Sequence, residues 1–147
     1  MFSYEFPIVA AQTAVYAYEL TRDVDALAAA RNWAVNIRAQ MPPSCGRRWG
    51  KEIAEVLPEA TIRGGTYAEN YGRVISFFLH LHRATGDEQE LNTAVALADE
   101  AIGKLYQNGW FRGHPAKPYY ESTDGVAYLL YALVELALHP KELPANL

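Results

Sequence analysis

Hydrophobic and polar positions divide this chain into two kinds of segment. Residues 8–20, 66–84 and 123–138 are apolar on nearly every side of a helical wheel, whereas residues 24–40 and 88–106 place apolar side chains every three or four positions. The first kind predicts a helix that is covered on all sides, and the second predicts a helix with one face in water. The pattern therefore predicts an all-α chain of five helices in which inner and outer helices alternate.

The helical pairs recur along the chain. "ELTRDVDALAAARNWA" and "RATGDEQELNTAVALA" match at an offset of 64 residues, which aligns Asp23 with Asp87 and predicts an internal repeat of a helical hairpin. Asp87 followed by Glu90 predicts a capping box, and Gly86 is expected to end the helix before it. We therefore expect the two hairpins to turn in the same way.

Alternating inner and outer helices predict antiparallel hairpins arranged as an α/α toroid or as a stack. Strands are disfavoured because the chain has no clean alternation with a period of two. Five helices leave the last one without a partner, and the tail "HPKELPANL" is too short and proline-rich to provide it. We expect residues 1–147 to form a single all-α domain that is either a piece of a larger toroid or covers its last helix in an oligomer.

Composition narrows the possible partners. The chain has 147 residues, half of them hydrophobic, and a net charge of −4 without a basic stripe, so nucleic acid is not an expected partner. Residues 126–138 are too short for a bilayer span and contain Glu135, so we expect no membrane segment. Cys45 is the only cysteine, which leaves the compartment open. If Met1 is the true start, the lack of a basic leader favours the cytoplasm.

Two long loops, 41–65 and 107–121, each follow a one-sided helix and so open at the same end of the hairpins. They combine aromatic rings with cations, a set that suits sugar faces and carboxylates. We expect an acidic oligosaccharide as ligand, although the rings could instead hold the loops on the helix ends while the charges are solvated. The predicted substrate-binding residues, in these loops and on the next helix, are Trp49, Arg63, Asn70, Arg73, Trp110, Arg112 and Tyr119.

The stretch "TIRGGTYAENYGR" opens the third helix. Thr66 followed by Glu69 fits a capping box, which would make Glu69 structural, and the same register puts Tyr67 near the open end. "YYESTDGV" repeats the order aromatic, acid, glycine. The helix dipole favours acids there, so structural and ligand roles are both open. With the histidine of "RGHP", the candidate catalytic residues are Tyr67, Glu69, His114, Tyr120, Glu121 and Asp124.

Two stretches carry a family resemblance. "ATGDEQELNTAVALADEAI" and "GWFRGHPAKPYYESTDGVAYLLYALVEL" resemble the helical hairpins of six-hairpin glycosidase-like and polysaccharide-lyase-like α/α toroids, roughly over residues 60–138. The resemblance implies action on polysaccharides, unsaturated oligosaccharides or amino sugars, with the site at the open end of the ring. The chain has about half the helices of such a toroid.

Several functions fit this reading. In a lyase, Arg63 or Arg112 would neutralise a uronate carboxylate while a histidine or tyrosine takes the C5 proton. In a glycoside hydrolase, two of the candidate carboxylates would act as acid and base. A glycan-binding module without catalysis and a structural domain that oligomerises through its last helix are the non-enzymatic alternatives.

Metal and cofactor sites are not expected. His80 and His82 are two residues apart on a predicted helix and therefore lie on different faces, which is poor geometry for a metal. "RGGTY" lacks the lysine and the preceding strand of a phosphate-binding loop.

Overall fold

The computed structural model describes residues 5–40, 66–115 and 125–139. All five predicted helices occur within these residues, and each boundary differs from the predicted one by no more than three residues. None of these helices is both long enough and apolar enough to cross a membrane. The elements in chain order are α1 (Glu5–Thr21), α2 (Val24–Gln40), α4 (Ala68–Thr85), α5 (Glu88–Leu105), β1 (Tyr106–Gln107), β2 (Trp110–Phe111) and α6 (Val126–Ala137).

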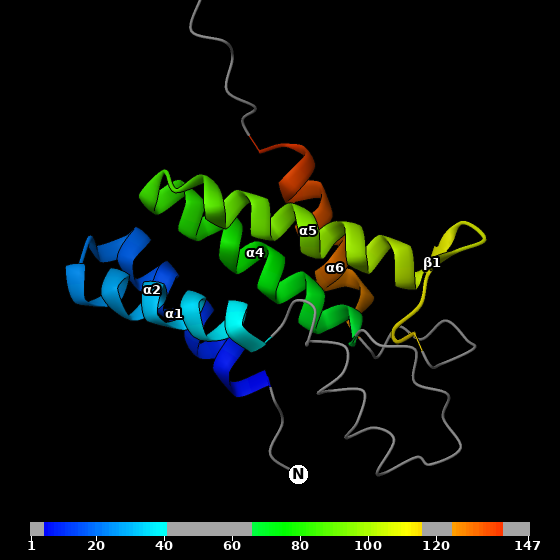
Figure 1. The fold of residues 1–147 in the computed structure, drawn as a ribbon, viewed down its shortest axis with the longest axis horizontal. Coiled ribbons are helices and arrows are strands. Elements are labelled where there is room, and N and C mark those ends of the chain that lie inside the picture. Colours follow the sequence, from blue (N-terminus) through cyan, green and yellow to red (C-terminus); the bar gives the residue numbers. More distant parts are fainter. Residues whose placement is uncertain (1–4, 41–65, 116–124, 140–147) are drawn as a thin grey trace, which may run out of the picture.

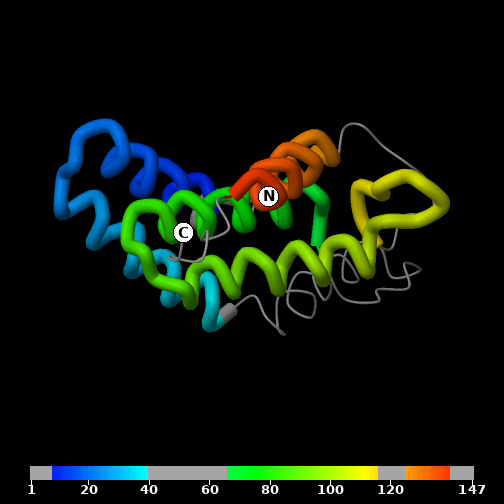
Figure 2. The backbone as a smooth tube through the Cα atoms, turned by 90° about the horizontal axis from the view of Figure 1, so that it is seen from above, coloured from blue at the N-terminus to red at the C-terminus, as the bar shows by residue number. Residues whose placement is uncertain are grey.

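Helix α4 lies between α1 and α6, while α2 packs on α1 and α5 packs on α4 (Figure 1). Figure 2 shows α1 and α6 on one side of α4, with α2 and α5 on the other. The three helices with apolar residues all round are therefore neighbours, and the two one-sided helices cover them from one face. One cluster of buried side chains joins α1, α2, α4, α5 and α6.

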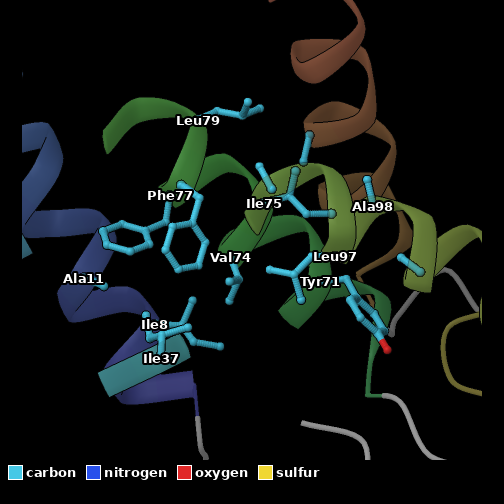
Figure 3. Close-up of a cluster of buried hydrophobic side chains, with 14 of the residues drawn as sticks. Ile8, Ala11, Ile37, Tyr71, Val74, Ile75, Phe77, Leu79, Leu97 and Ala98 are labelled. Carbon is cyan, nitrogen blue, oxygen red and sulfur yellow. The ribbon is translucent and has the colours of Figure 1, made fainter. Parts of the chain in front are cut away.

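The core is centred on α4, as the sequence predicts. Its large side chains, including Tyr71, Phe77 and Leu81, have no exposed surface, and they reach α1, α5 and α6 (Figure 3). In α5, by contrast, Leu97 and Leu105 are buried while Asn92 and Asp99 are exposed, although Ile102 of the predicted apolar face is also 42% exposed. This difference confirms the reading of an all-round helix beside a one-sided one.

The same reading is wrong for α1 and α6. Leu20 at the end of α1 is 86% exposed, and Tyr131, Val134 and Leu138 of the last helical segment are 70%, 57% and 77% exposed. Among the described residues α1 packs on α2 and α4, and α6 packs mainly on α4, so an outer face of each helix has no cover.

The two hairpin turns have the same hydrogen bonds, which confirms the repeat. Arg22 and Gly86 both adopt a left-handed conformation, with φ of 60° and 69°, and their amides donate to carbonyls four residues earlier. In both turns an aspartate accepts from the amide two residues later at 2.9 Å. Asp87 is therefore the expected cap, but the Glu90 carboxylate does not complete the capping box: it is buried and pairs with Arg38 of α2.

Residues 106–111 depart from the prediction. They form a small antiparallel hairpin in which Tyr106 pairs with Phe111, where the sequence analysis placed a helix end and a loop. Asn108 and Gly109 make the turn with φ of 52° and 88°. Asn-Gly is a strong hairpin signal because both positions tolerate positive φ, so the sequence contained this information.

Candidate functional site

A line of polar side chains runs along the otherwise apolar helix α4. Its members are four, three, four and three residues apart, so they share one face of the helix. Their partners come from α1 on one side and α6 on the other. The residues of this polar line are Glu69, Arg73, Ser76, His80 and Arg83.

Arg73 is held in place by three neighbours. Its Nε and Nη2 atoms lie 2.8 and 2.7 Å from Glu69 Oε1, and Nη1 donates to Gln12 Oε1 at 3.4 Å. The guanidinium carbon also lies 4.2 Å from the ring centroid of Tyr128. These contacts from three helices fix a cation that keeps 21% of its side-chain surface exposed.

A cleft of about 450 Å³ opens beside Arg73. Helix α4 forms its base, and α1 and α6 form its walls. Tyr128 and Tyr131 are 48% and 70% exposed; Arg73 covers one face of the Tyr128 ring, and the remaining ring surface is available to a ligand. The lining residues are Gln12, Tyr16, Gly72, Arg73, Ser76, Ala127, Tyr128 and Tyr131.

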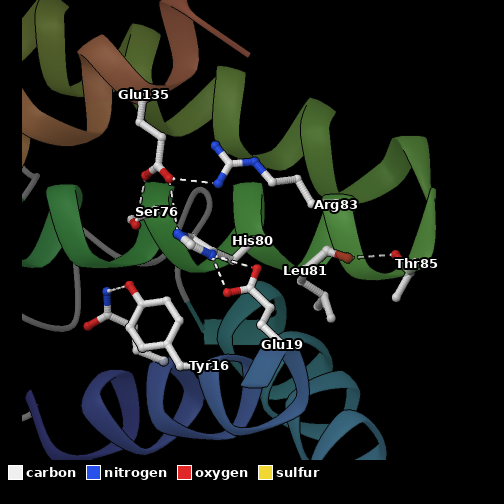
Figure 4. Close-up of polar contacts among 9 residues, drawn as sticks. Tyr16, Glu19, Ser76, His80, Leu81, Arg83, Thr85 and Glu135 are labelled. Atoms are coloured by element: carbon white, nitrogen blue, oxygen red, sulfur yellow. Dashed lines mark hydrogen bonds and ion pairs between the residues drawn. The ribbon is translucent and has the colours of Figure 1, made fainter. Parts of the chain in front are cut away.

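His80 joins the two walls just beyond the cleft (Figure 4). Its Nδ1 lies 2.7 and 2.8 Å from the two carboxylate oxygens of Glu19 in α1, and its Nε2 lies 3.0 Å from Glu135 Oε1 in α6. Tyr16 meets the imidazole edge to face, with ring centroids 4.8 Å apart. Since both ring nitrogens face carboxylates, this histidine suits a structural link better than proton transfer to a ligand.

The surroundings favour the charged imidazolium of His80 and the charged carboxylate of Glu135. Burial works against the charged imidazole, but hydrogen bonds and charges from Glu135 and Glu19 outweigh it and raise the pKa of His80 above its ordinary value of 6.5. Burial likewise works against the Glu135 carboxylate, yet His80, Ser76 and Arg83 lower the pKa of Glu135 below 4.5. Ser76 Oγ donates to Glu135 at 2.9 Å, and Arg83 Nη1 lies 3.0 Å from it.

Two glycines allow the elements around the cleft to approach closely. A Cβ at Gly72 would lie 2.5 Å from the amide nitrogen of Leu129 and still closer to the carbonyl group of Tyr128, so α4 and α6 touch main chain to main chain. Gly125, with φ of 72°, precedes α6, and a Cβ there would overlap Glu69. Both glycines therefore admit a protein neighbour rather than leaving space for a ligand.

The start of α4 lies against the segment after β2. The ring of Tyr67 is 4.6 Å from that of His114, and the amide of Ala68 donates to Gly113 O at 2.8 Å. Asn70 Nδ2 donates to Thr66 Oγ1 at 3.0 Å. The structure thus brings together two predicted catalytic residues, but His114 is only 1% exposed, whereas the sequence analysis placed it in an open loop.

The capping box predicted for Thr66 and Glu69 is wrong. Tyr67 is the N-cap residue and makes no side-chain capping bond, while Glu69 turns to Arg73. The competing i,i+4 ion pair holds the carboxylate on the face of the helix that borders the cleft.

The remaining predicted residues do not belong to the cleft or lie outside the described part of the chain. Trp110 is 68% exposed on β2, and Arg112 follows that strand. Neither lines the cleft. Six predicted residues lie outside the described part of the chain: Trp49, Arg63, Tyr119, Tyr120, Glu121 and Asp124.

Several residues of the cleft and of the group around His80 were not predicted from the sequence. A usable signal was present: Glu135 is the only charged residue in the apolar stretch 126–138, and Ser76 and His80 interrupt an apolar helix at a spacing of four. Polar groups on a covered helix need partners, so they point to one another. The missed residues are Gln12, Tyr16, Glu19, Ser76, His80, Tyr128, Tyr131 and Glu135.

His80 and His82 do point in different directions. His82 Nδ1 lies 2.9 Å from His139 Nε2, away from the carboxylates that bind His80. Within residues 5–40, 66–115 and 125–139, no group of three or more His, Cys, Asp or Glu side chains is placed to hold a metal ion.

Comparisons with protein families, with curated proteins and with solved structures find no match to this chain.

Proposed function

We propose that the protein is a carbohydrate-active protein of the α/α-toroid type that binds an acidic oligosaccharide in the cleft between α1, α4 and α6. Its reaction would be that of a lyase or a glycoside hydrolase. The observation that carries the proposal is Arg73, a fixed and partly exposed cation beside exposed tyrosine rings. The placement of α1 and α6 on one side of α4, with α2 and α5 on the other, supports the toroid reading.

The cleft has the size and chemistry for such a ligand. Its volume falls within the range of small-molecule sites, about 300–1,000 Å³. Tyrosine faces stack on the apolar faces of sugar rings, while amide, hydroxyl and guanidinium groups bind hydroxyls and carboxylates. Tyr131 of α6 supplies a ring face, Gln12 of α1 supplies an amide, and Arg73 of α4 supplies a guanidinium group.

The two reactions use the cleft differently. In a lyase, Arg73 would stabilise the uronate carboxylate as negative charge develops, and Tyr16 is a candidate to take the proton. In a hydrolase, Glu69 would be one carboxylate, with Glu121 or Asp124 as the second. Formation of a conjugated double bond, measured by ultraviolet absorbance, identifies the lyase, whereas new reducing ends without it identify the hydrolase.

Calorimetric titration with an oligogalacturonate tests binding, with the methyl-esterified oligosaccharide of equal length as the neutral control. We expect Arg73→Gln to weaken binding about tenfold or more, because hydrogen bonds to charged groups contribute about 1.5–3 kcal/mol. Arg31→Gln on α2 is the matched control and should bind normally. Equal affinity for the acidic and the esterified ligand would remove the role of Arg73.

Tyr131→Ala tests the stacking surface. Loss of one aromatic contact is worth about 0.5–1.5 kcal/mol, so we expect affinity to fall about two- to tenfold. Tyr106→Ala, which removes another exposed ring away from the cleft, should leave affinity unchanged. Binding of none of the tested oligosaccharides would reject the proposed function.

A structural domain that oligomerises through α6 is the second candidate. It is favoured by the apolar outer face of α6, where Leu130, Tyr131 and Val134 are 45–70% exposed. Sedimentation velocity distinguishes the two ideas. The structural role predicts an oligomer that Val134→Asp dissociates, and a monomer at all concentrations would exclude it.

A further inference from the structure

His80 is placed to couple the two walls of the cleft. Glu19, on its Nδ1 side, belongs to α1, which supplies Gln12 and Tyr16 to the cleft. Glu135, on its Nε2 side, belongs to α6, which supplies the exposed tyrosines. Two carboxylates can both receive a hydrogen bond from this ring only when both of its nitrogens carry protons.

We propose that protonation of His80 regulates the ligand cleft: the imidazolium holds α1 against α4 through Glu19, and its deprotonation releases that wall and weakens ligand binding. The ligand in this proposal is the one assigned under the proposed function. The link between His80 and α1 does not depend on that assignment.

The two carboxylates differ in how they respond to loss of the proton. Glu135 also accepts from Ser76 and pairs with Arg83, and its side chain is 10% exposed. Glu19 is 29% exposed, and within the described part of the chain His80 is its hydrogen-bonding partner. Because water can replace the lost hydrogen bond at the more exposed Glu19, the remaining proton in this proposal stays on Nε2 toward Glu135, and the lone pair on Nδ1 then faces the Glu19 carboxylate.

Repulsion at this contact acts directly on the cleft. Tyr16 lies one helical turn before Glu19, packs edge to face on His80, and lines the cleft. Its hydroxyl accepts from Gln12 Nε2 at 3.3 Å, which ties together two lining residues of α1. When the end of α1 moves away from α4, both side chains move with it.

The direction of the pH effect follows from the groups that face His80. They are Tyr16 and Glu19 from α1, Glu135 from α6, and Ser76 and Arg83 from α4 itself. The pKa of His80 is raised, so the folded chain holds the proton more tightly than the unfolded chain does. The stabilisation that protonated His80 gives the folded chain is complete below about pH 6.5 and is lost as the pH rises through the folded-state pKa of His80.

Glu135 and His139 also have shifted pKa values, but both titrate on the acid side of their ordinary values. The pKa of Glu135 is lowered, so its stabilising effect is present above its ordinary value and is lost only in acid. The pKa of His139 is lowered by burial and by the charges of His82 and Arg83, so His139 loses its proton on the acid side of its ordinary value. A loss of affinity at alkaline pH that persists in His82→Gln and disappears in Glu19→Gln therefore reports His80.

The first measurement is the dissociation constant of an oligogalacturonate at about pH 5.5 and about pH 8.5, on either side of the ordinary histidine value. We expect the wild-type chain to bind about tenfold more weakly at the higher pH, the effect of losing one charged hydrogen bond. Glu19→Gln should keep the tighter binding at both values, because its amide donates to a neutral Nδ1. His82→Gln, on the same helix, should retain the wild-type pH dependence.

The second measurement needs no ligand. Hydrogen exchange of the last turn of α1, corrected for the intrinsic effect of pH, should become faster at the higher pH in the wild-type chain and not in Glu19→Gln. If no oligosaccharide binds at either pH, the proposed function fails and exchange alone decides the link. Equal corrected exchange at both pH values, or the same pH dependence in Glu19→Gln as in the wild type, would overturn the inference.

Discussion

The hairpins α1–α2 and α4–α5 share a turn and a residue spacing but differ in what surrounds their first helix. Phe77 and Leu81 of α4 are fully buried, while the residues 64 positions earlier, Thr13 and Ala17 of α1, are exposed or half-buried. Helix α4 has α1, α5 and α6 as neighbours, whereas α1 has mainly α2 and α4. The turn is thus set by local sequence, and the size of the side chains follows the number of neighbouring helices.

The largest expected effect tests the buried side of this comparison. Phe77→Ala should lower the free energy of unfolding by about 3–5 kcal/mol because it leaves a cavity between α4 and its neighbours. Thr13→Ala, at the matching position of α1, should change it by less than about 0.5 kcal/mol. Denaturant unfolding followed by circular dichroism measures both. Similar losses at the two positions would show that the hairpins are packed alike.

The next effect tests the close contact between α4 and α6. Gly72→Ala places a methyl group against the main chain of α6, and overpacking of about 1–3 kcal/mol should exceed the gain in helix propensity of about 1 kcal/mol. Gly103→Ala is the matched control, because a Cβ at this exposed position of α5 meets nothing within 4 Å. It should stabilise the chain by about 0.5–1 kcal/mol. A stabilising Gly72→Ala would mean that α6 is not held at this distance in solution.

The smallest effect compares the turns themselves. Gly86→Ala should destabilise the chain by about 1 kcal/mol, because a side chain is disfavoured in the left-handed conformation. Arg22→Gly, at the equivalent position, should stabilise it by about 0.5 kcal/mol, since the strain relieved exceeds the added entropy of the unfolded chain. Thermal unfolding monitors both changes, and a loss of stability in Arg22→Gly would show that the two turns are not equivalent.

Sequence patterning predicted the helices well because the period and the width of an apolar face are local properties. It located α4 in the core, yet it overestimated the cover on α1 and α6, since hydrophobicity alone does not say whether a neighbour exists. Asn108 and Gly109 are a hairpin signal, but residues 107–121 were predicted to form a loop.

The candidate site was harder to predict. Glu69 and Arg73 were identified near the start of α4, although the sequence left both a capping role and a ligand role open for Glu69. Tyr16 and Glu135 were missed because they come from helices far apart in sequence, and only the packing of α1 and α6 on α4 brings them together. Side chains that act from separate helices leave no motif with a fixed spacing.

The contact at Gly72 bears on how this protein can change over time. Because the distance between α4 and α6 is set by main-chain atoms at Gly72, Tyr128 and Leu129, side chains on the rim of the cleft can be exchanged without altering its width as long as position 72 remains glycine. Under the proposed function, substitution of Tyr128 or Tyr131 would alter which molecules bind while the frame stays fixed. A cleft built in this way separates the evolution of recognition from the evolution of shape.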